Sequence, residues 1–189
     1  MQIFVEMVGD YHKFQSLVDY YAEERYMDDV DEMTYRVALE CKKDIQAIYN
    51  GAKEPPLSVR RLHPWTIKLK GSTTPFKNTK KLSESVEVVK IDNAVYMVRV
   101  RPNILTDNGF EYYKVAKILE EGTEIAVTEA MRKYLRANGL FIKDSTNLIV
   151  IPKRPVWRPM AEVYSKILRA RAYGIYEEKA MKAKRTKIY

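Results

Sequence analysis

The feature that most constrains the fold is a predicted β-hairpin in the middle of the chain. Two β-rich runs, residues 85–91 and 94–101, are separated by Asp92-Asn93. Aspartate and asparagine tolerate the positive φ angles that a two-residue hairpin turn demands. We therefore expect an antiparallel sheet here, and the elements on either side are interpreted around it.

A helix is predicted before the hairpin, from about Asp31 to Asn50, with Asn50-Gly51 as its end. Its apolar residues recur at three- and four-residue spacing and so share one face, which should pack on a sheet: Val37, Cys41, Ile45 and Ile48. Nothing in the sequence beside Cys41 would lower the pKa of its thiol, so we interpret it as a buried structural cysteine. A weaker helical pattern covers residues 11–26.

The segment between this helix and the hairpin changes from helical to alternating periodicity after Pro55-Pro56. Trp65, Ile67 and Leu69 fall on one side, which predicts a half-buried strand. Residues 71–81 combine turn formers with basic residues and lack an apolar period, so we expect an exposed loop. With Lys68 and Lys70 this stretch forms the basic loop, residues 68–81.

The second half of the chain predicts an inserted helical pair, a strand and a closing helix. The pair covers residues 110–121, ended by Gly122, and residues 128–138, capped by Thr128 and ended by Gly139. The apolar run 148–151 suits a strand buried on both faces. A last helix should begin at Pro159, with a buried face made by Val163, Tyr164, Ile167 and Leu168.

These elements predict an α+β fold: N-terminal helices, a mostly antiparallel sheet with a β-hairpin, an inserted helical pair and a C-terminal helix. We expect one domain over residues 1–174, with a helical segment at 1–50 and a basic tail at 175–189. The tail is helix-prone, and three arrangements stay open for it: it extends the last helix, crosses to a neighbouring subunit, or stays loose.

No arrangement of residues in the sequence indicates catalysis. Phosphate-binding glycine loops, nucleophile elbows and metalloprotease motifs are absent from the sequence. One cysteine and two histidines are too few for a zinc site, so we expect no metal and no cofactor. His63 precedes a proline and is interpreted as structural or exposed. Glu120 and Glu121 would point about 100° apart on a helix, which favours a solvated helix end over acid–base chemistry.

The net charge of +8 is unevenly distributed along the chain. Residues 1–50 carry 5 Lys/Arg and 11 Asp/Glu, whereas residues 51–101 carry 11 and 4, and residues 153–189 carry 11 and 3. An acidic first quarter beside basic segments suits copies of one chain packing head to tail, and it suits DNA equally well. No apolar run approaches the ~20 residues of a membrane span, and the N-terminus lacks a signal-peptide pattern, so we expect synthesis and use in the cytoplasm.

Three stretches, in order, carry a resemblance to a known family. They are residues 75–86, residues 127–135 after the Glu-x-Gly element at 120–122, and the Ile-Pro-x-Arg-Pro segment at 151–155, which runs on to Pro159. Together they resemble the small neck and tail-completion proteins of long-tailed bacteriophages, over about residues 55–170. The chain departs from the family in two places: Lys80 stands where glycine is usual, and Val156-Trp157 exchanges the sizes of an aromatic–aliphatic pair.

The resemblance implies a structural virion protein, one of about six or twelve copies in a ring at the head–tail junction. Its partners would be portal-side connector or head-closure proteins and a tail terminator or tail tube protein, with packaged DNA as a further contact. A DNA-binding accessory protein that uses the basic loop and the basic tail is the alternative, because Tyr173, Tyr176 and Tyr189 interleave with the basic residues of the tail. The candidate residues facing a partner or DNA are Lys68, Lys70, Lys77, Lys80, Lys81, Arg154, Trp157, Arg158, Arg169 and Arg171.

Arg154 is the candidate with the clearest physical reason. Pro152 and Pro155 on either side hold the chain extended, so the arginine projects from a stiff support with little entropy to lose. Its planar fork suits a carboxylate or backbone carbonyls. A clamp within the subunit and a contact across an interface both remain open for it.

Overall fold

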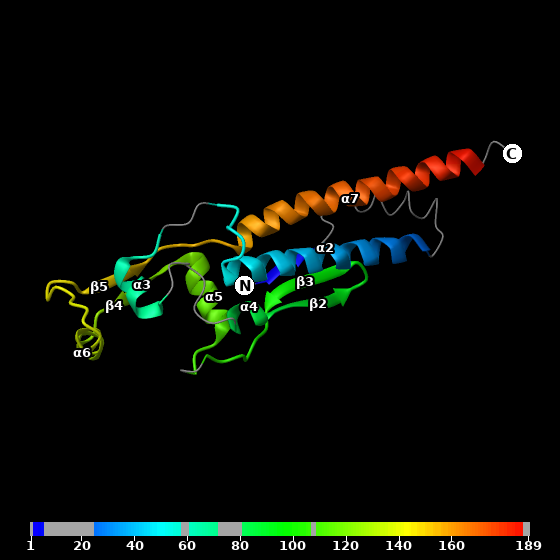
Figure 1. The fold of residues 1–189 in the computed structure, drawn as a ribbon. Helices are drawn as coiled ribbons and strands as arrows, with labels where there is room; N and C mark the ends of the chain where they lie inside the picture. The colour runs from blue at the N-terminus through cyan, green and yellow to red at the C-terminus, as the bar shows by residue number, and fades with distance from the viewer. Residues whose placement is uncertain (1, 6–24, 58–60, 72–80, 107–108, 187–189) are drawn as a thin grey trace.

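A computed structural model of the chain describes residues 2–5, 25–57, 61–71, 81–106 and 109–186 (Figure 1). Its fold is α+β, as the sequence predicts. The elements follow the chain in this order: β1 (Gln2–Val5), α2 (Arg25–Asn50), α3 (Pro64–Lys70), α4 (Lys81–Glu84), β2 (Val86–Asp92), β3 (Val95–Val100), α5 (Tyr112–Glu121), β4 (Thr123–Ala126), α6 (Glu129–Ala137), β5 (Leu148–Ile151) and α7 (Trp157–Thr186). Among the described residues, no helix is long and apolar enough to cross a membrane.

The predicted hairpin is confirmed as β2 and β3, and β1 joins it to make a three-stranded antiparallel sheet in the order β1-β3-β2. The register pairs Val86 with Val100 and Val5 with Tyr96. The turn lies one residue later than predicted, because Ala94 has the positive φ of 55°. The pairing register of β2 and β3 also shifts between Lys90 and Asp92.

The main core forms where α2 crosses the sheet. The predicted stripe on α2 is buried, with Val37, Cys41, Ile45 and Ile48 all at 0% exposure. It packs among Val98 and Val100 of β3 and Val86 of β2. Burial raises the pKa of the Cys41 thiol to about 12, so the thiolate is not formed at neutral pH and the prediction of a structural cysteine is confirmed.

Helices α2 and α7 run antiparallel and are joined by polar contacts along their length. The Arg171 guanidinium donates to both carboxylate oxygens of Glu40, at 3.0 and 2.9 Å. The Tyr164 hydroxyl donates to Asp44 at 2.8 Å. At the start of α7 the Trp157 indole donates to the Tyr49 hydroxyl at 2.6 Å inside the core. The tail therefore extends the last helix as far as Thr186, and α7 begins two residues before Pro159.

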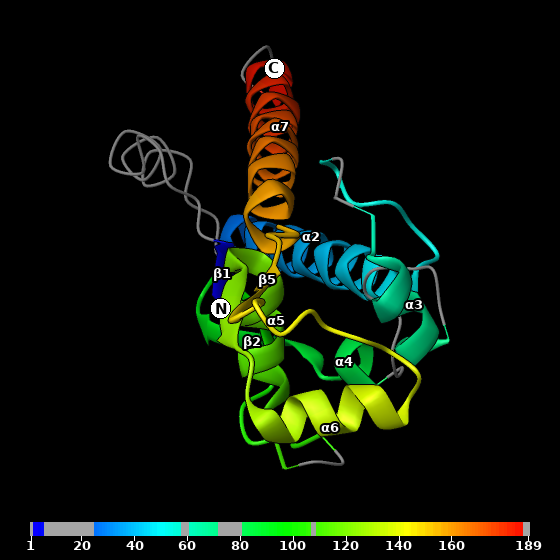
Figure 2. The same cartoon turned by 90° about the vertical axis from the view of Figure 1, so that its left-hand side faces the viewer.

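A second, smaller layer lies beyond the Asn50 end of α2 (Figures 1 and 2). Here β4 and β5 pair antiparallel, with Thr123 opposite Ile151. Helix α6 covers them through a cluster of its own, in which Leu135, Leu140 and Ile142 are buried. The predicted pair of helices, α5 and α6, is confirmed, including the cap from Met131 N–H to the Thr128 hydroxyl and the stops at Gly122 and Gly139.

Three predictions about local structure are wrong. Residues 64–70 form a helix instead of a strand: Pro64 suits a first helical turn, and Ile67 N–H donates to His63 O at 3.1 Å. An alternation over five residues is too short to exclude a helix. Strand β5 is not buried on both faces, since Leu148 is 52% and Val150 64% exposed in a sheet of only two strands. On α7, Val163 is exposed, while Tyr164 and Leu168 are buried as predicted.

Asp31, in the second turn of α2, connects this helix to the hairpin through hydrogen bonds. Its carboxylate accepts hydrogen bonds from Lys90 Nζ at 2.9 Å, Ala94 N–H at 2.8 Å and the Tyr96 hydroxyl at 2.8 Å. Burial raises the pKa of this carboxyl, but the three donors together with the charge of Lys90 lower it further, so the pKa lies below its ordinary value. The folded state therefore favours the charged form.

Replacing Asp31 with asparagine should lower the free energy of unfolding by about 1 kcal/mol at neutral pH. Because the folded pKa is below the unfolded one, the wild-type advantage is full above pH ~4 and disappears as the pH falls through the folded pKa. Urea unfolding of both proteins between pH 7 and pH 2 measures this. A stability difference that stays constant or grows on acidification would contradict the assignment.

Candidate functional site: a docking groove

A groove of about 950 Å³ opens between the two layers of the fold. Its walls are apolar and come from four elements: Leu62, Pro64 and Thr66 at and beside α3; Val115, Ile118 and Leu119 on α5; Met131, Tyr134 and Leu135 on α6; and Ile149, Val150 and Ile151 on β5. Tyr134 is 61% and Val150 64% exposed, large apolar areas that a monomer leaves open to water. A site of this size suits a side-chain-bearing segment or a small ligand.

Two arginines and a histidine line the groove: Arg61 and His63, which are exposed, and Arg154, which is 6% exposed. The main chain holds Arg154 in place, because Arg154 N–H donates to Leu119 O at 2.7 Å. Among the described residues, Arg154 Nε is buried and has no hydrogen-bond acceptor. Burial lowers the pKa of this guanidinium below its ordinary value, yet arginine stays charged in proteins. The groove thus contains a nearly buried positive charge that no carboxylate of the described chain neutralises.

Glu120 fixes the segment that carries Arg154. Its Oε2 accepts from Val156 N–H at 2.7 Å and Trp157 N–H at 3.1 Å, and its Oε1 accepts from Arg158 N–H at 3.0 Å. These groups lie at the start of α7, where backbone N–H groups lack partners within the helix and the helix dipole favours an anion. Glu120 is therefore buried at 8% exposure, and the prediction that it is solvated is wrong.

Gly122 allows the end of α5 to pack closely against residues 151–153, next to Arg154. Its φ is 71°, and a Cβ there would lie 2.8 Å from Ile151 O and 3.0 Å from Lys153 N. Any side chain would both strain the backbone and push β5 away from the end of α5. The Glu-x-Gly element and the Ile-Pro-x-Arg-Pro segment, about thirty residues apart in the chain, thus form one contact.

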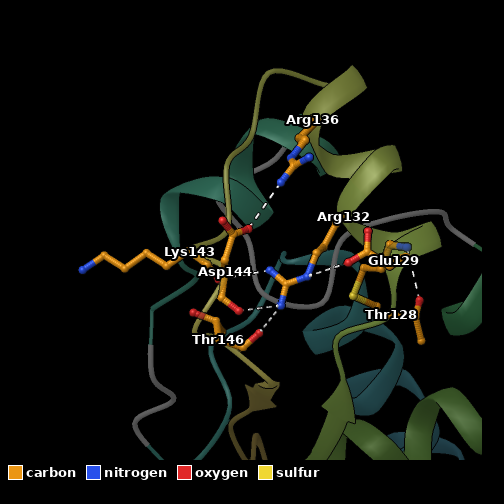
Figure 3. A network of polar contacts seen from close by, with 8 residues as sticks. Thr128, Glu129, Arg132, Arg136, Lys143, Asp144 and Thr146 are labelled. Carbon is orange, nitrogen blue, oxygen red and sulfur yellow. Dashed lines mark hydrogen bonds and ion pairs between the residues drawn. The ribbon is translucent and has the colours of Figure 1, made fainter.

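Arg132 stabilises the loop that connects α6 with β5 (Figure 3). The loop's carbonyls converge on its guanidinium, which donates to Lys143 O at 3.0 Å, Asp144 O at 3.2 Å and Thr146 O at 2.7 Å. Arg132 is 8% exposed, and its neighbour Arg136 donates to the Asp144 side chain at 3.4 Å. Arg132 therefore positions the α6 and β5 walls of the groove relative to each other.

Replacing Arg132 with methionine should lower the free energy of unfolding by about 1–3 kcal/mol, because three carbonyls lose their donor. Hydrogen exchange of residues 140–147 should quicken more than that of the main core. Arg136→Met is the matched control and should cost less than about 0.5 kcal/mol, since its ion pair is exposed. Equal effects of the two changes would show that Arg132 does not order the loop.

The structure separates the residues that the sequence groups as a contact surface. Lys68 lies on α3 and donates to Gly139 O at 3.4 Å; Lys70 is the last residue of α3, and Lys81 the first of α4. The basic loop is thus helical at both ends, while Lys77 and Lys80 lie outside the described residues, as does most of the predicted helix at 11–26. Arg158 and Arg169 are exposed on α7, and Arg171 pairs with Glu40.

The prediction that Trp157 faces a partner or DNA is wrong. The side chain is 1% exposed and belongs to the main core, so it cannot face a partner or DNA. Sequence reasoning also missed Glu120 and Arg132 as structural anchors, because each acts through backbone groups distant in sequence. The sequence did contain one signal for Glu120, its position two residues before a glycine that ends a helix.

Within the described part of the chain, no group of three or more His, Cys, Asp or Glu side chains could hold a metal ion. The chain matches no family model, and no curated protein and no solved structure matches it.

Proposed function

We propose that this chain is a structural protein of the neck of a long-tailed bacteriophage, one of six or twelve copies in a ring at the head–tail junction. Its partners would be the portal-side connector or head-closure proteins and the tail terminator or tail tube protein. The ring would be needed for tail completion or for joining the tail to the head. It would be assembled from chains made in the host cytoplasm, and it has no enzymatic role.

One contact supports the proposal most. Two stretches that carry the family resemblance, residues 120–122 and 151–155, lie against each other, joined by Arg154 N–H to Leu119 O and closed by Gly122. Glu120 also accepts from the Val156 and Trp157 N–H groups, so these two stretches form one structural unit. The same junction presents Arg154 to an open apolar groove, which suits assembly with another chain.

The charge distribution supports ring formation through attraction between acidic and basic surfaces of neighbouring copies. Residues 1–50 are net acidic, whereas residues 153–189 are net basic. Contacts between unlike surfaces of identical chains form a ring when the rotation closes. Complementary charge would favour this head-to-tail pairing over symmetric pairing of like surfaces.

Phage particles made with and without this gene test the proposal. We expect particles lacking the protein to accumulate as DNA-filled heads and separate tails, and expression of the wild-type chain to restore joined particles. Complete infectious particles that form without the protein would overturn it.

A DNA-binding accessory protein is the second candidate, and the end of α7 favours it. Figure 2 shows this helix projecting away from the sheets, and the rings of Tyr173 and Tyr176 lie side by side on it, with centroids 6.4 Å apart and planes tilted by 41°. Replacing the five basic residues of the tail, Lys179, Lys182, Lys184, Arg185 and Lys187, with glutamine should then weaken DNA binding and flatten its salt dependence. Weak binding that salt does not affect would dismiss this candidate.

A further inference from the structure

We propose that the groove binds the acidic, aromatic segment of residues 6–24 from a second copy of this chain. The inference deepens the proposed self-assembly and rests on it, but it does not depend on where the ring sits in a particle. The inference is argued from four observations: Arg154, which no carboxylate among the described residues neutralises; the exposed apolar walls of the groove; the composition of residues 6–24; and the described residues that flank that segment.

The groove selects for an apolar segment that carries a carboxylate. Its walls offer Tyr134, Val150 and Met131 for apolar contact, and Arg154 offers a nearly buried guanidinium. An unpaired buried charge is costly, and a bidentate carboxylate is the partner that best fits a guanidinium. Arg61, which is exposed, adds positive charge to the lining of the groove. A neutral or basic segment would leave the Arg154 charge unpaired.

Residues 6–24 have this chemistry. They carry one lysine and five acids: Glu6, Asp10, Asp19, Glu23 and Glu24. Large apolar residues recur at three- and four-residue spacing, which places Phe14, Leu17, Val18 and Tyr21 on one face of the helix that the sequence predicts there. Asp10 immediately precedes this predicted helix, four residues before Phe14, and so stands at one end of the same face. The face thus combines an apolar stripe with a carboxylate at one end, matching the groove and Arg154.

Chain length requires that the segment come from another copy. Val5 pairs with Tyr96, and the Tyr96 hydroxyl donates to Asp31 in the second turn of α2, so the two described residues that flank the segment, Val5 and Arg25, lie toward the start of that helix. The groove lies toward the Asn50 end, and a helix of 26 residues is about 39 Å long (Figure 1). Asp10 is five residues from Val5 and Tyr21 is four residues from Arg25, so neither can lie more than about 18 Å from its anchor. The groove of the same copy is therefore out of reach for this face.

A contact between the segment of one copy and the groove of the next joins two unlike surfaces. Such heterologous contacts repeat around a ring and leave no copy with an empty groove once the ring closes. The acidic segment would then neutralise the groove arginine in every subunit.

Cysteine cross-linking of the whole chain tests the contact. The single native cysteine, Cys41, is fully buried and does not compete. A Leu17→Cys chain is mixed with a Tyr134→Cys chain under mild oxidation, and we expect a disulfide-linked heterodimer. The matched control is Tyr173→Cys, which is also 61% exposed but lies on α7 away from the groove, and it should give about tenfold less product.

Two further changes separate docking from random collision. Adding Asp10→Asn to the Leu17→Cys chain, or Val150→Asp to the Tyr134→Cys chain, should each lower the yield about tenfold. Val150→Asp leaves the core intact, since Val150 is 64% exposed, and Asp10→Asn exchanges a carboxylate for an amide of the same size. Equal yields for Tyr134→Cys and Tyr173→Cys would overturn the inference.

Native mass measurement of the same samples distinguishes the docking of residues 6–24 from ring formation itself. Rings that form without the Leu17–Tyr134 cross-link would overturn the docking of residues 6–24 and leave the proposed function standing. A chain that stays monomeric throughout would remove both.

Discussion

Replacing Trp157 with alanine is expected to lower the free energy of unfolding by about 3–5 kcal/mol, the usual cost of removing a fully buried tryptophan. The side chain is 1% exposed and joins the start of α7 to the end of α2. Its indole donates to the Tyr49 hydroxyl at 2.6 Å, and the two rings lie 6.5 Å apart at 55°. The change therefore opens a cavity where both helices meet and leaves the Tyr49 hydroxyl without its donor.

Urea unfolding measures this loss, with Tyr49→Phe as the companion variant. Removing only the hydroxyl leaves the indole N–H buried without an acceptor and should cost about 1–3 kcal/mol. A loss below 1 kcal/mol for Trp157→Ala would mean that the tryptophan is not in the core and would restore it as a candidate for a partner surface.

The second large effect is expected at Glu120. Replacing it with alanine removes the acceptor for three backbone N–H groups at the start of α7 and should lower the free energy of unfolding by about 2–4 kcal/mol. Glu121 is the matched control, because it is adjacent, exposed and equally charged. Glu121→Ala should change stability by no more than about 0.5 kcal/mol.

Denaturant unfolding of the Glu120 and Glu121 variants, together with hydrogen exchange at the start of α7, measures the difference. Exchange of the amides of Val156, Trp157 and Arg158 should quicken in Glu120→Ala alone. Equal stability of the two variants would show that the Glu120 carboxylate does not fix the start of α7. The carboxylate would then not explain how Arg154 is held in the groove.

Local sequence signals predicted the parts of the fold that depend on neighbours in the chain. The stripe on α2, the hairpin, and the caps of α5 and α6 all follow from spacing and from residues such as Thr128 and Gly139. Helix α3 was missed because five alternating residues fit a strand as well as a short helix. The apolar run 148–151 correctly predicted a strand. The exposure of its side chains could not be predicted, because it depends on how many other strands and helices cover that strand.

The groove could not be predicted because it depends on contacts between distant segments. Arg154 stood out in the sequence through its flanking prolines, yet its surroundings come from α3, α5, α6 and β5 together. Trp157 was predicted to lie at a surface together with the Ile-Pro-x-Arg-Pro segment that it follows. It lies inside because it packs in the main core, where it contacts residues as distant in sequence as Tyr49, 108 residues earlier.

Self-assembly into a ring is the claim on which the function rests, and native mass spectrometry of the 189-residue chain tests it most directly. We expect a closed species of one copy number, six or twelve, which high salt weakens because acidic and basic surfaces meet in each contact. A monomer at every protein concentration and at low as well as high salt would contradict it.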